Sequence, residues 1–335
     1  MNGYDTHTLA GVIGQLEPFN PFLLNLLTTG VVTFESEYID FDVVDEDMQL
    51  APFVSPMVAG KVMKEQGATL KKFKPAYVKP KDQVSPSRVL KRRPGEQLGG
   101  TLTGQARRDA IVTDILDTHR QKIRRREEWM VAQELLSGSV TVSGEDYPTA
   151  LVDFQRDGDK TVVLAGGAKW DQGTALPIED LEDWFARLEA PATHVIMGAG
   201  AFRKMIGFQE VKDLIDTRRG SDTLLEMGPA NALAFFRGRF GGAGPEIWTY
   251  TGWYKDAAGA KQLFIPDNAV VVVSTATNLV RTYGAIMDGR AGYQAMEMFP
   301  KNWVQEDPSH EFVMTQSAPL PIPARVNATL AATVY

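Results

Sequence analysis

Residues 105–136 have the sequence QARRDAIVTDILDTHRQKIRRREEWMVAQELL. Apolar side chains recur there at mostly three- and four-residue spacing, as on one face of an α-helix. They are Val112, Ile115, Leu116, Ile123, Met130 and Leu135, with His119 on the same spacing. Ser137 and Gly138 follow, and glycine is a common stop signal. The pattern predicts a helix of about 32 residues and about 48 Å, long enough to be the spine of an elongated body.

The middle of this expected helix, residues 120–128, is charged on most sides. The simplest interpretation is a solvated helix with ion pairs between successive turns. A phosphate-binding surface is the alternative, and the acidic pair Glu127 and Glu128 disfavours it.

An apolar segment lies near the N-terminus. Asn20 can cap a helix and Pro21 suits its first position, with the apolar residues 22–27 following. Two interpretations stay open: a short helix packed on its own domain, or an arm that docks on a neighbouring molecule. Residues 31–48 then alternate as in a strand, with acids on one face.

Residues 50–100 contain six prolines at intervals that exclude a long helix. The pattern predicts a long extended hairpin. Such a charged excursion buries little of itself and needs a partner surface to be ordered.

Charge divides sharply in this region. The segment from Glu35 to Asp47 has seven acids and no base. The segment from Lys61 to Arg93 has eleven bases and two acids, a local charge of +9 in a chain of net charge −7. A basic arm on an acidic body can bind a polyanion or the acidic face of another copy. A dedicated nucleic-acid binder is usually basic as a whole, which favours the second interpretation.

Beyond the long helix, residues 139–165 are typical of short strands joined by turns. A second unit is expected from about Pro177. The expected elements are a helix at 178–188, a strand at 194–197, one helix through 202–215, a flexible glycine-rich loop at 238–244, and strands at 246–250, 262–265, 269–274, 281–287, 293–299 and 312–316.

Composition excludes several classes of site. The chain has 335 residues, 44% of them hydrophobic, which suits two or three packed units. It has no cysteine, and its four histidines are scattered, so no metal site is expected. Neither a Walker phosphate loop nor a G-x-S-x-G elbow occurs. No secretory signal is visible at Met1–Asp5, and the densest apolar run, Ala269–Val273, is too short for a bilayer. We expect no enzymatic activity and no cofactor.

Several sequence blocks occur in an ordered set. They are residues 51–62 (APFVSPMVAGKV), 74–86 (KPAYVKPKDQVSP), 214–221 (LIDTRRGS), 264–268 (FIPDN), 280–288 (VRTYGAIMD), 299–304 (FPKNWV) and 312–320 (FVMTQSAPL). In this order and spacing the chain resembles the lambda-like major capsid proteins, the capsid protein E family of tailed phages.

The resemblance implies the Hong Kong 97-type capsid fold, an α+β architecture. It divides the chain into an N-terminal arm (1–34), a peripheral-domain strand (35–49), an extended loop (50–100), a peripheral domain with the spine helix (101–176), an axial domain (177–290) and a peripheral return (291–335). It also implies a shell of hexamers and pentamers around double-stranded DNA. Expected partners are a decoration protein, a portal, and a separate scaffold, because no long helical scaffold segment precedes the arm.

In this interpretation the basic arm lies over acidic surface on neighbouring subunits, with apolar anchors. Arg218 and Arg219 are expected to reach a carboxylate, either across a subunit boundary or within the chain. The candidate contact residues are Glu35, Glu37, Asp40, Asp42, Phe53, Lys71, Lys72, Lys74, Tyr77, Lys79, Lys81, Arg92, Arg93, Asp216, Arg218 and Arg219.

Two other functions stay open. An encapsulin-like compartment would use the same fold to house a protein cargo. A DNA-binding protein would act through the basic segment 61–93.

Overall fold

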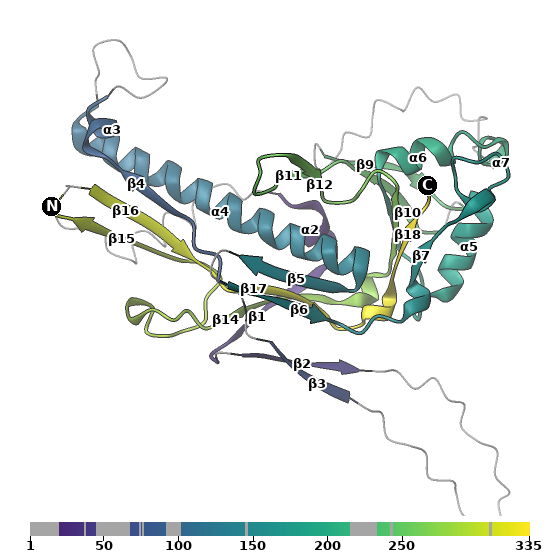
Figure 1. Ribbon diagram of the computed structural model, residues 1–335, viewed down its shortest axis with the longest axis horizontal. Helices are drawn as coiled ribbons and strands as arrows, with labels where there is room; N and C mark the ends of the chain where they lie inside the picture. The colour runs from purple at the N-terminus through teal and green to yellow at the C-terminus, as the bar shows by residue number, and fades with distance from the viewer. Residues whose placement is uncertain are drawn as a thin grey trace, which may run out of the picture.

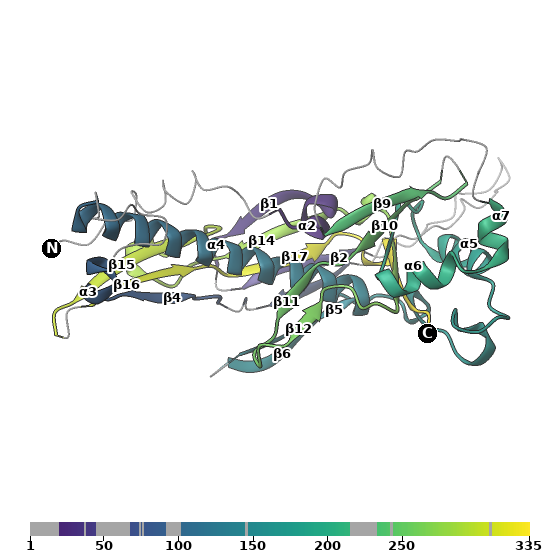
Figure 2. The ribbon, with the colours of Figure 1, turned by 90° about the horizontal axis from the view of Figure 1, so that it is seen from above.

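The computed structural model describes residues 20–36, 38–44, 68–73, 75, 77–91, 102–144, 147–214, 233–241, 244–307 and 310–335. Figures 1 and 2 show an elongated body with the long helix α4 (Gly104–Ser137) along it and a six-stranded sheet at one end. Within these ranges, no helix combines the length and the apolar character that a bilayer crossing requires.

Helix α4 confirms the predicted spine and extends it by one residue at each end. The Thr103 side chain caps its start by accepting a hydrogen bond from Ala106 N at 3.2 Å. Gly138 ends it in the left-handed conformation, with φ of 68°. The apolar face of α4 packs against three separate clusters. These are built around Leu116 with Val313, around Met130 with Phe154, and around Leu135 with Leu24.

The middle of α4 differs from the solvated helix expected there. The side chains of Glu127 and Glu128 are buried, and so are His119 and Arg120. Segments from distant parts of the chain supply hydrogen-bond partners for Glu127, Glu128 and His119 away from water.

Most of the body along α4 is built from small antiparallel or mixed sheets. The strands are β1 (Thr28–Phe34), β14 (Leu279–Gly284) and β17 (Pro319–Pro323) in one sheet; β15 (Phe299–Gln305), β16 (His310–Gln316) and β4 (Lys81–Val84) in a second; β5 (Ser139–Gly144) and β6 (Tyr147–Asp153) in a third; and β2 (Ile39–Val44) with β3 (Ala68–Phe73) in a fourth. The short helices α2 (Phe22–Leu27) and α3 (Pro86–Leu90) pack on α4.

The six-stranded sheet has the order β7-β18-β13-β8-β10-β9. Its strands are β7 (Thr161–Val163), β18 (Thr329–Thr333), β13 (Ala269–Val273), β8 (His194–Met197), β10 (Glu246–Tyr250) and β9 (Ala234–Arg239). Every residue of β13 is buried, as the unbroken apolar sequence AVVVV suggests for a central strand. Strands β7 and β18 come from outside residues 177–290, so the chain returns to this sheet near its C-terminus.

Helices α5 (Pro177–Arg187), α6 (Ala199–Met205) and α7 (Gln209–Leu214) lie beside the six-stranded sheet (Figure 1). Trp170 and Trp184 stack there with ring centroids 5.9 Å apart. A small hairpin, β11 (Trp253–Lys255) and β12 (Lys261–Leu263), stands over the middle of α4 (Figure 1). The remaining short turns are 3₁₀ helices at Gly158–Lys160, Gly166–Ala168, Thr275–Thr277, Gly289–Ala291 and Val326–Ala328.

Three expected elements differ in the structure. The single helix expected through 202–215 is two helices, α6 and α7, because the chain turns at Gly207, whose N–H bonds to Lys204 O at 3.0 Å. The strand expected at 293–299 begins only at Phe299, after a turn in which Tyr293 has a φ of 59°. Part of the glycine-rich tract expected as a loop is strand, since β9 runs to Arg239 through Gly238.

Candidate assembly surfaces

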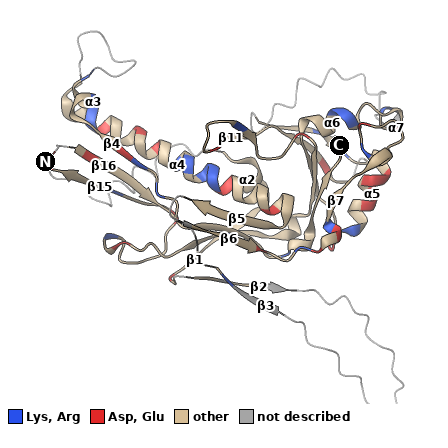
Figure 3. Ribbon diagram, in the orientation of Figure 1, with Lys and Arg blue, Asp and Glu red and all other residues tan. Residues whose placement is uncertain are grey.

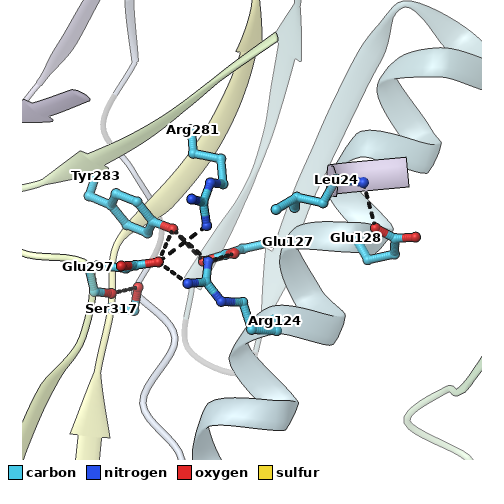
Figure 4. A network of polar contacts seen from close by, with 8 residues as sticks. All are labelled: Leu24, Arg124, Glu127, Glu128, Arg281, Tyr283, Glu297 and Ser317. Carbon is cyan, nitrogen blue, oxygen red and sulfur yellow. Dashed lines mark hydrogen bonds and ion pairs between the residues drawn. The ribbon is translucent and has the colours of Figure 1, made fainter. Parts of the chain in front are cut away.

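The N-terminal arm is tied to the spine helix by one buried carboxylate. Glu128 of α4 accepts hydrogen bonds from the backbone N–H groups of Leu23 and Leu24, both at 2.9 Å. Figure 4 shows the bond from Leu24. Pro21 occupies the N-cap position of α2 in place of the expected Asn20, and it has no side-chain acceptor to offer. Glu128 therefore caps the N-terminus of α2 in place of a local side chain.

Glu128 also reaches the six-stranded sheet. Tyr250, at the end of β10, donates its hydroxyl proton to Glu128 at 2.8 Å. Burial raises the pKa of Glu128, against the lowering effect of the Leu23 and Leu24 N–H groups. The arm helix, with four of its six residues buried, packs on its own chain. The structure thus supports the first of the two interpretations of residues 22–27.

A second buried network lies one residue earlier on α4 (Figure 4). Glu127 accepts hydrogen bonds from Arg124 at 2.8 Å and from the Tyr283 hydroxyl at 2.9 Å. Arg124 also pairs with Glu297, which Arg281 approaches at 3.3 Å. Burial raises the pKa of Glu127, while Arg124 lowers it. This network joins the spine to β14 and to the segment leading into β15.

Residues 77–84 return along the body and are fixed to it by backbone and side-chain bonds. Tyr77 donates its hydroxyl proton to Ala285 O at 2.6 Å and accepts from Met287 N at 3.1 Å. Strand β4 pairs with β16, and Asp82 lies 3.0 Å from the ring nitrogen Nε2 of His119 on α4. Burial holds the pKa of His119 below its ordinary value, although Asp82 raises it. Tyr77 is therefore an anchor within its own chain.

The exposed lysines of this return lie over aromatic rings of the same chain. The Lys79 ammonium is 4.6 Å from the centre of the Tyr77 ring, and that of Lys81 is 4.1 Å from the Phe312 ring. Both side chains are exposed, so their charge is presented at the surface while their stems cover apolar area.

Strands β2 and β3 join the acidic and the basic segments into one antiparallel hairpin. Asp40 lies opposite Lys72 in the register, Phe41 opposite Lys71, and Asp42 opposite Leu70. Opposite charges facing each other across a strand pair are favourable. Part of the acidic segment therefore lies opposite part of the basic segment within a single chain. Sequence analysis assigned this pairing to neighbouring copies.

Apolar residues hold the end of the hairpin where Ile39 lies opposite Phe73. From there strands β2 and β3 run along the outside of the body (Figure 1). Ile39 is fully buried, and Phe41 and Phe73 pack on the same cluster as Phe154. The Phe41 and Phe154 ring centroids are 5.7 Å apart. Phe73, at the end of β3, thus contacts its own chain.

The remaining candidates are placed as follows. Glu35 is exposed in the turn between β1 and β2, and Lys72 is exposed on β3. Asp40, Asp42 and Lys71 are placed by strand register alone. Glu37, Phe53, Lys74, Arg92, Arg93, Asp216, Arg218 and Arg219 lie outside the described residues. Contact of any candidate with a neighbouring subunit stays a prediction.

Sequence reasoning missed Glu127, Glu128, Tyr250 and Tyr283 as organising residues. Apart from the Arg124–Glu127 pair within α4, the bonds that join these residues to one another and to Leu23 span more than a hundred positions, so no local spacing points to them. Among the residues that the structure places, no three His, Asp or Glu side chains gather as metal ligands would.

Comparison with known proteins decides the family. The model of the phage major capsid protein E family matches residues 5–334. This chain belongs to that family. Among curated relatives, the major capsid proteins of Escherichia phages lambda and N15 are 31% and 32% identical over 329 residues, with 96% of each chain covered.

A solved structure gives the same answer for the fold. The putative capsid protein of a prophage from E. coli CFT073 superimposes with a TM-score of 0.78 at 27% identity, covering 100% of both chains. The expected α+β fold of the Hong Kong 97 type is confirmed for this member of the capsid protein E family.

Proposed function

We propose that this chain is the major capsid protein of a tailed double-stranded DNA phage. It assembles with itself, through hexamers and pentamers, into the icosahedral head that encloses the genome. Family membership over nearly the whole chain supports this function. Among the curated relatives of similar length are the major capsid proteins of two Escherichia phages.

The observation that carries the proposal within this structure is the β2–β3 hairpin. Among the described strands, β2 and β3 pair only with each other. A two-stranded hairpin is marginally stable by itself in water. Among the hairpin residues whose side chains the structure describes, Ile39, Phe41 and Phe73 pack on the body. The remainder is expected to find its support on a neighbouring subunit.

The neighbour would meet two kinds of surface. Apolar contact is expected from Phe53, and charge from the basic residues that β2 does not complement. Exposed pairs contribute only about 0–1 kcal/mol each, so they set register and orientation more than affinity. The candidates on the basic side are Lys71, Lys72, Lys74, Lys79, Lys81, Arg92 and Arg93, and those on the acidic side are Glu35, Glu37, Asp40 and Asp42.

A second contact is proposed at the segment that contains Asp216, Arg218 and Arg219. Replacing both arginines by glutamate is expected to block ring formation and leave the monomer folded, as gel filtration and circular dichroism would report. Normal shells from that variant would show that this segment does not contribute to the interface.

The shell is expected in the virion, after assembly in the host cytoplasm. A decoration protein, a scaffold and a portal of the same phage are proposed as further partners. The DNA inside is expected to be enclosed without sequence-specific contact, because a chain of net charge −7 does not attract phosphates.

The contents of particles test this function against its alternatives. Particles are purified from cells that carry the complete phage, treated with nuclease, opened and analysed. Nuclease-protected double-stranded DNA in particles made mainly of this chain is the expected result. A protein cargo without DNA would establish the encapsulin-like compartment. Salt-sensitive DNA binding by the unassembled subunit, lost when residues 61–93 are neutralised, would favour the DNA-binding alternative.

A further inference from the structure

A cavity of about 880 Å³ opens between the middle of α4, the β11–β12 hairpin and β5. Ser143 of β5 and Leu233 before β9 complete its wall. Figure 2 shows β11, β12 and the end of β5 close together on one side of α4. Its volume lies in the range of sites that hold a small ligand or a short segment of chain.

The wall of this cavity is strongly basic. Lys122, Arg125 and Arg126 come from successive turns of α4, and Lys255 comes from β11. Figure 3 shows the basic residues gathered on this part of α4. Among the wall residues that the structure describes, Asp256 is the one acid. Its carboxylate accepts hydrogen bonds from Ala260 N at 2.8 Å and from Gln262 at 3.2 Å, so it is engaged in its own turn.

The same wall carries aromatic rings that are already fixed in place. Trp129 donates its indole N–H to the Tyr254 hydroxyl at 3.2 Å, and the Arg126 guanidinium lies 5.0 Å from the Trp129 ring. Tyr254 packs on Phe264 with centroids 5.3 Å apart. Trp253 remains 39% exposed, a large apolar surface beside the basic residues. Rigid aromatic groups beside cations suit a ligand with both negative charge and an apolar side chain.

We infer that this cavity is a docking site for a short acidic segment of an assembly partner, one that carries an apolar side chain to cover Trp253. Charge complementarity favours this occupant, because the described wall has four cations and one engaged carboxylate, and of the cations Lys122 also lies 3.9 Å from Asp82. The inference goes beyond shell formation, and its test uses the full-length unassembled protein.

The test measures fluorescence anisotropy of a short fluorescein-labelled peptide that repeats Glu-Leu-Glu. Wild-type protein is expected to bind it, and more weakly as salt rises. The variant Arg126→Glu/Lys255→Glu is expected to bind roughly tenfold more weakly or worse. Both side chains are exposed, so the fold is expected to survive, which circular dichroism checks. Trp253→Ala should also weaken binding, with no change in charge.

The matched control is Arg203→Glu/Lys212→Glu, which makes the same change in charge at exposed positions on α6 and α7. It should bind the peptide as the wild type does. Equal weakening in this control, wild-type affinity in Trp253→Ala, or no binding by the wild type would overturn the site. Tighter binding of a single-stranded or duplex DNA oligonucleotide, lost in the Arg126→Glu/Lys255→Glu variant, would reassign it to nucleic acid.

Discussion

Glu128 accepts a hydrogen bond from the backbone N–H of Leu23, 105 positions earlier in the chain, at 2.9 Å. Through that bond the spine helix caps a six-residue helix that has no cap of its own. Tyr250 binds the same carboxylate from the six-stranded sheet. The arm helix, the spine helix and the six-stranded sheet therefore meet at the side chain of Glu128. These bonds join the parts of the body from which the β2–β3 hairpin extends.

Replacing Glu128 by alanine should destabilise this junction. The N–H groups of Leu23 and Leu24 would lose their acceptor in a buried setting, at a cost of about 1–3 kcal/mol each. Urea denaturation of the unassembled protein measures the loss. The control is Asp109→Ala at an exposed position of the same helix, which should change stability by no more than about 0.5 kcal/mol. Equal effects of the two changes would show that Glu128 is not a structural cap.

Arg124 and Glu127 should behave as a coupled pair. Arg124→Met removes the cation beside a buried carboxylate, and we expect a loss of about 3–5 kcal/mol. Adding Glu127→Leu removes the stranded charge and should recover part of that loss. A double-mutant cycle of unfolding free energies measures the coupling. Strictly additive effects would contradict the network shown in Figure 4.

Glu134 should make stability depend on pH. Burial raises its pKa from the ordinary 4.5 to about 7, although Arg156 lowers it. The folded protein then holds a proton that the unfolded chain has released. Stability is therefore fully present below about pH 4.5 and falls as pH rises to about 7, by about 3 kcal/mol.

The variant Glu134→Gln keeps the shape and cannot ionise. Its unfolding free energy should change less with pH than that of the wild type between pH 4.5 and 7. Parallel curves for the two proteins would mean that Glu134 does not take up the proton.

The end of the spine depends on Gly138. Its φ is 68°, and a Cβ there would lie 2.6 Å from the Cβ of Arg156. Arg156 donates to Leu135 O at 2.6 Å and to Leu136 O at 2.8 Å, so it completes the cap. Gly138→Ala should cost about 1–3 kcal/mol. Gly104→Ala, at the open start of the same helix, is the matched control and should cost nothing, as thermal denaturation would show.

Local signals explain which elements could be predicted. The spine was predictable because the spacing of Ile115, Leu116 and Ile123 and the stop at Gly138 are properties of neighbouring residues. The break at Gly207 was not, since residues on both sides of it keep a helical pattern. The burial of Glu127 and Glu128 was not predictable either. It depends on hydrogen bonds from Tyr283 and Tyr250, which lie near them only in the folded chain.

The β2–β3 hairpin also shows what sequence alone could not predict. The acidic and basic segments were visible in the sequence as opposite charges, but their register was not. The β2–β3 register places Asp40 opposite Lys72, so the acidic and basic segments pair as strands within one chain. Charge alone could not separate pairing within a chain from pairing between copies.

We expect this chain to assemble with itself into a closed shell. Light scattering with negative-stain electron microscopy of the concentrated, purified protein, alone and co-expressed with a phage scaffold, tests it most directly. Hollow shells, or rings of five and six subunits, are the expected result. A protein that stays monomeric under both conditions would contradict it.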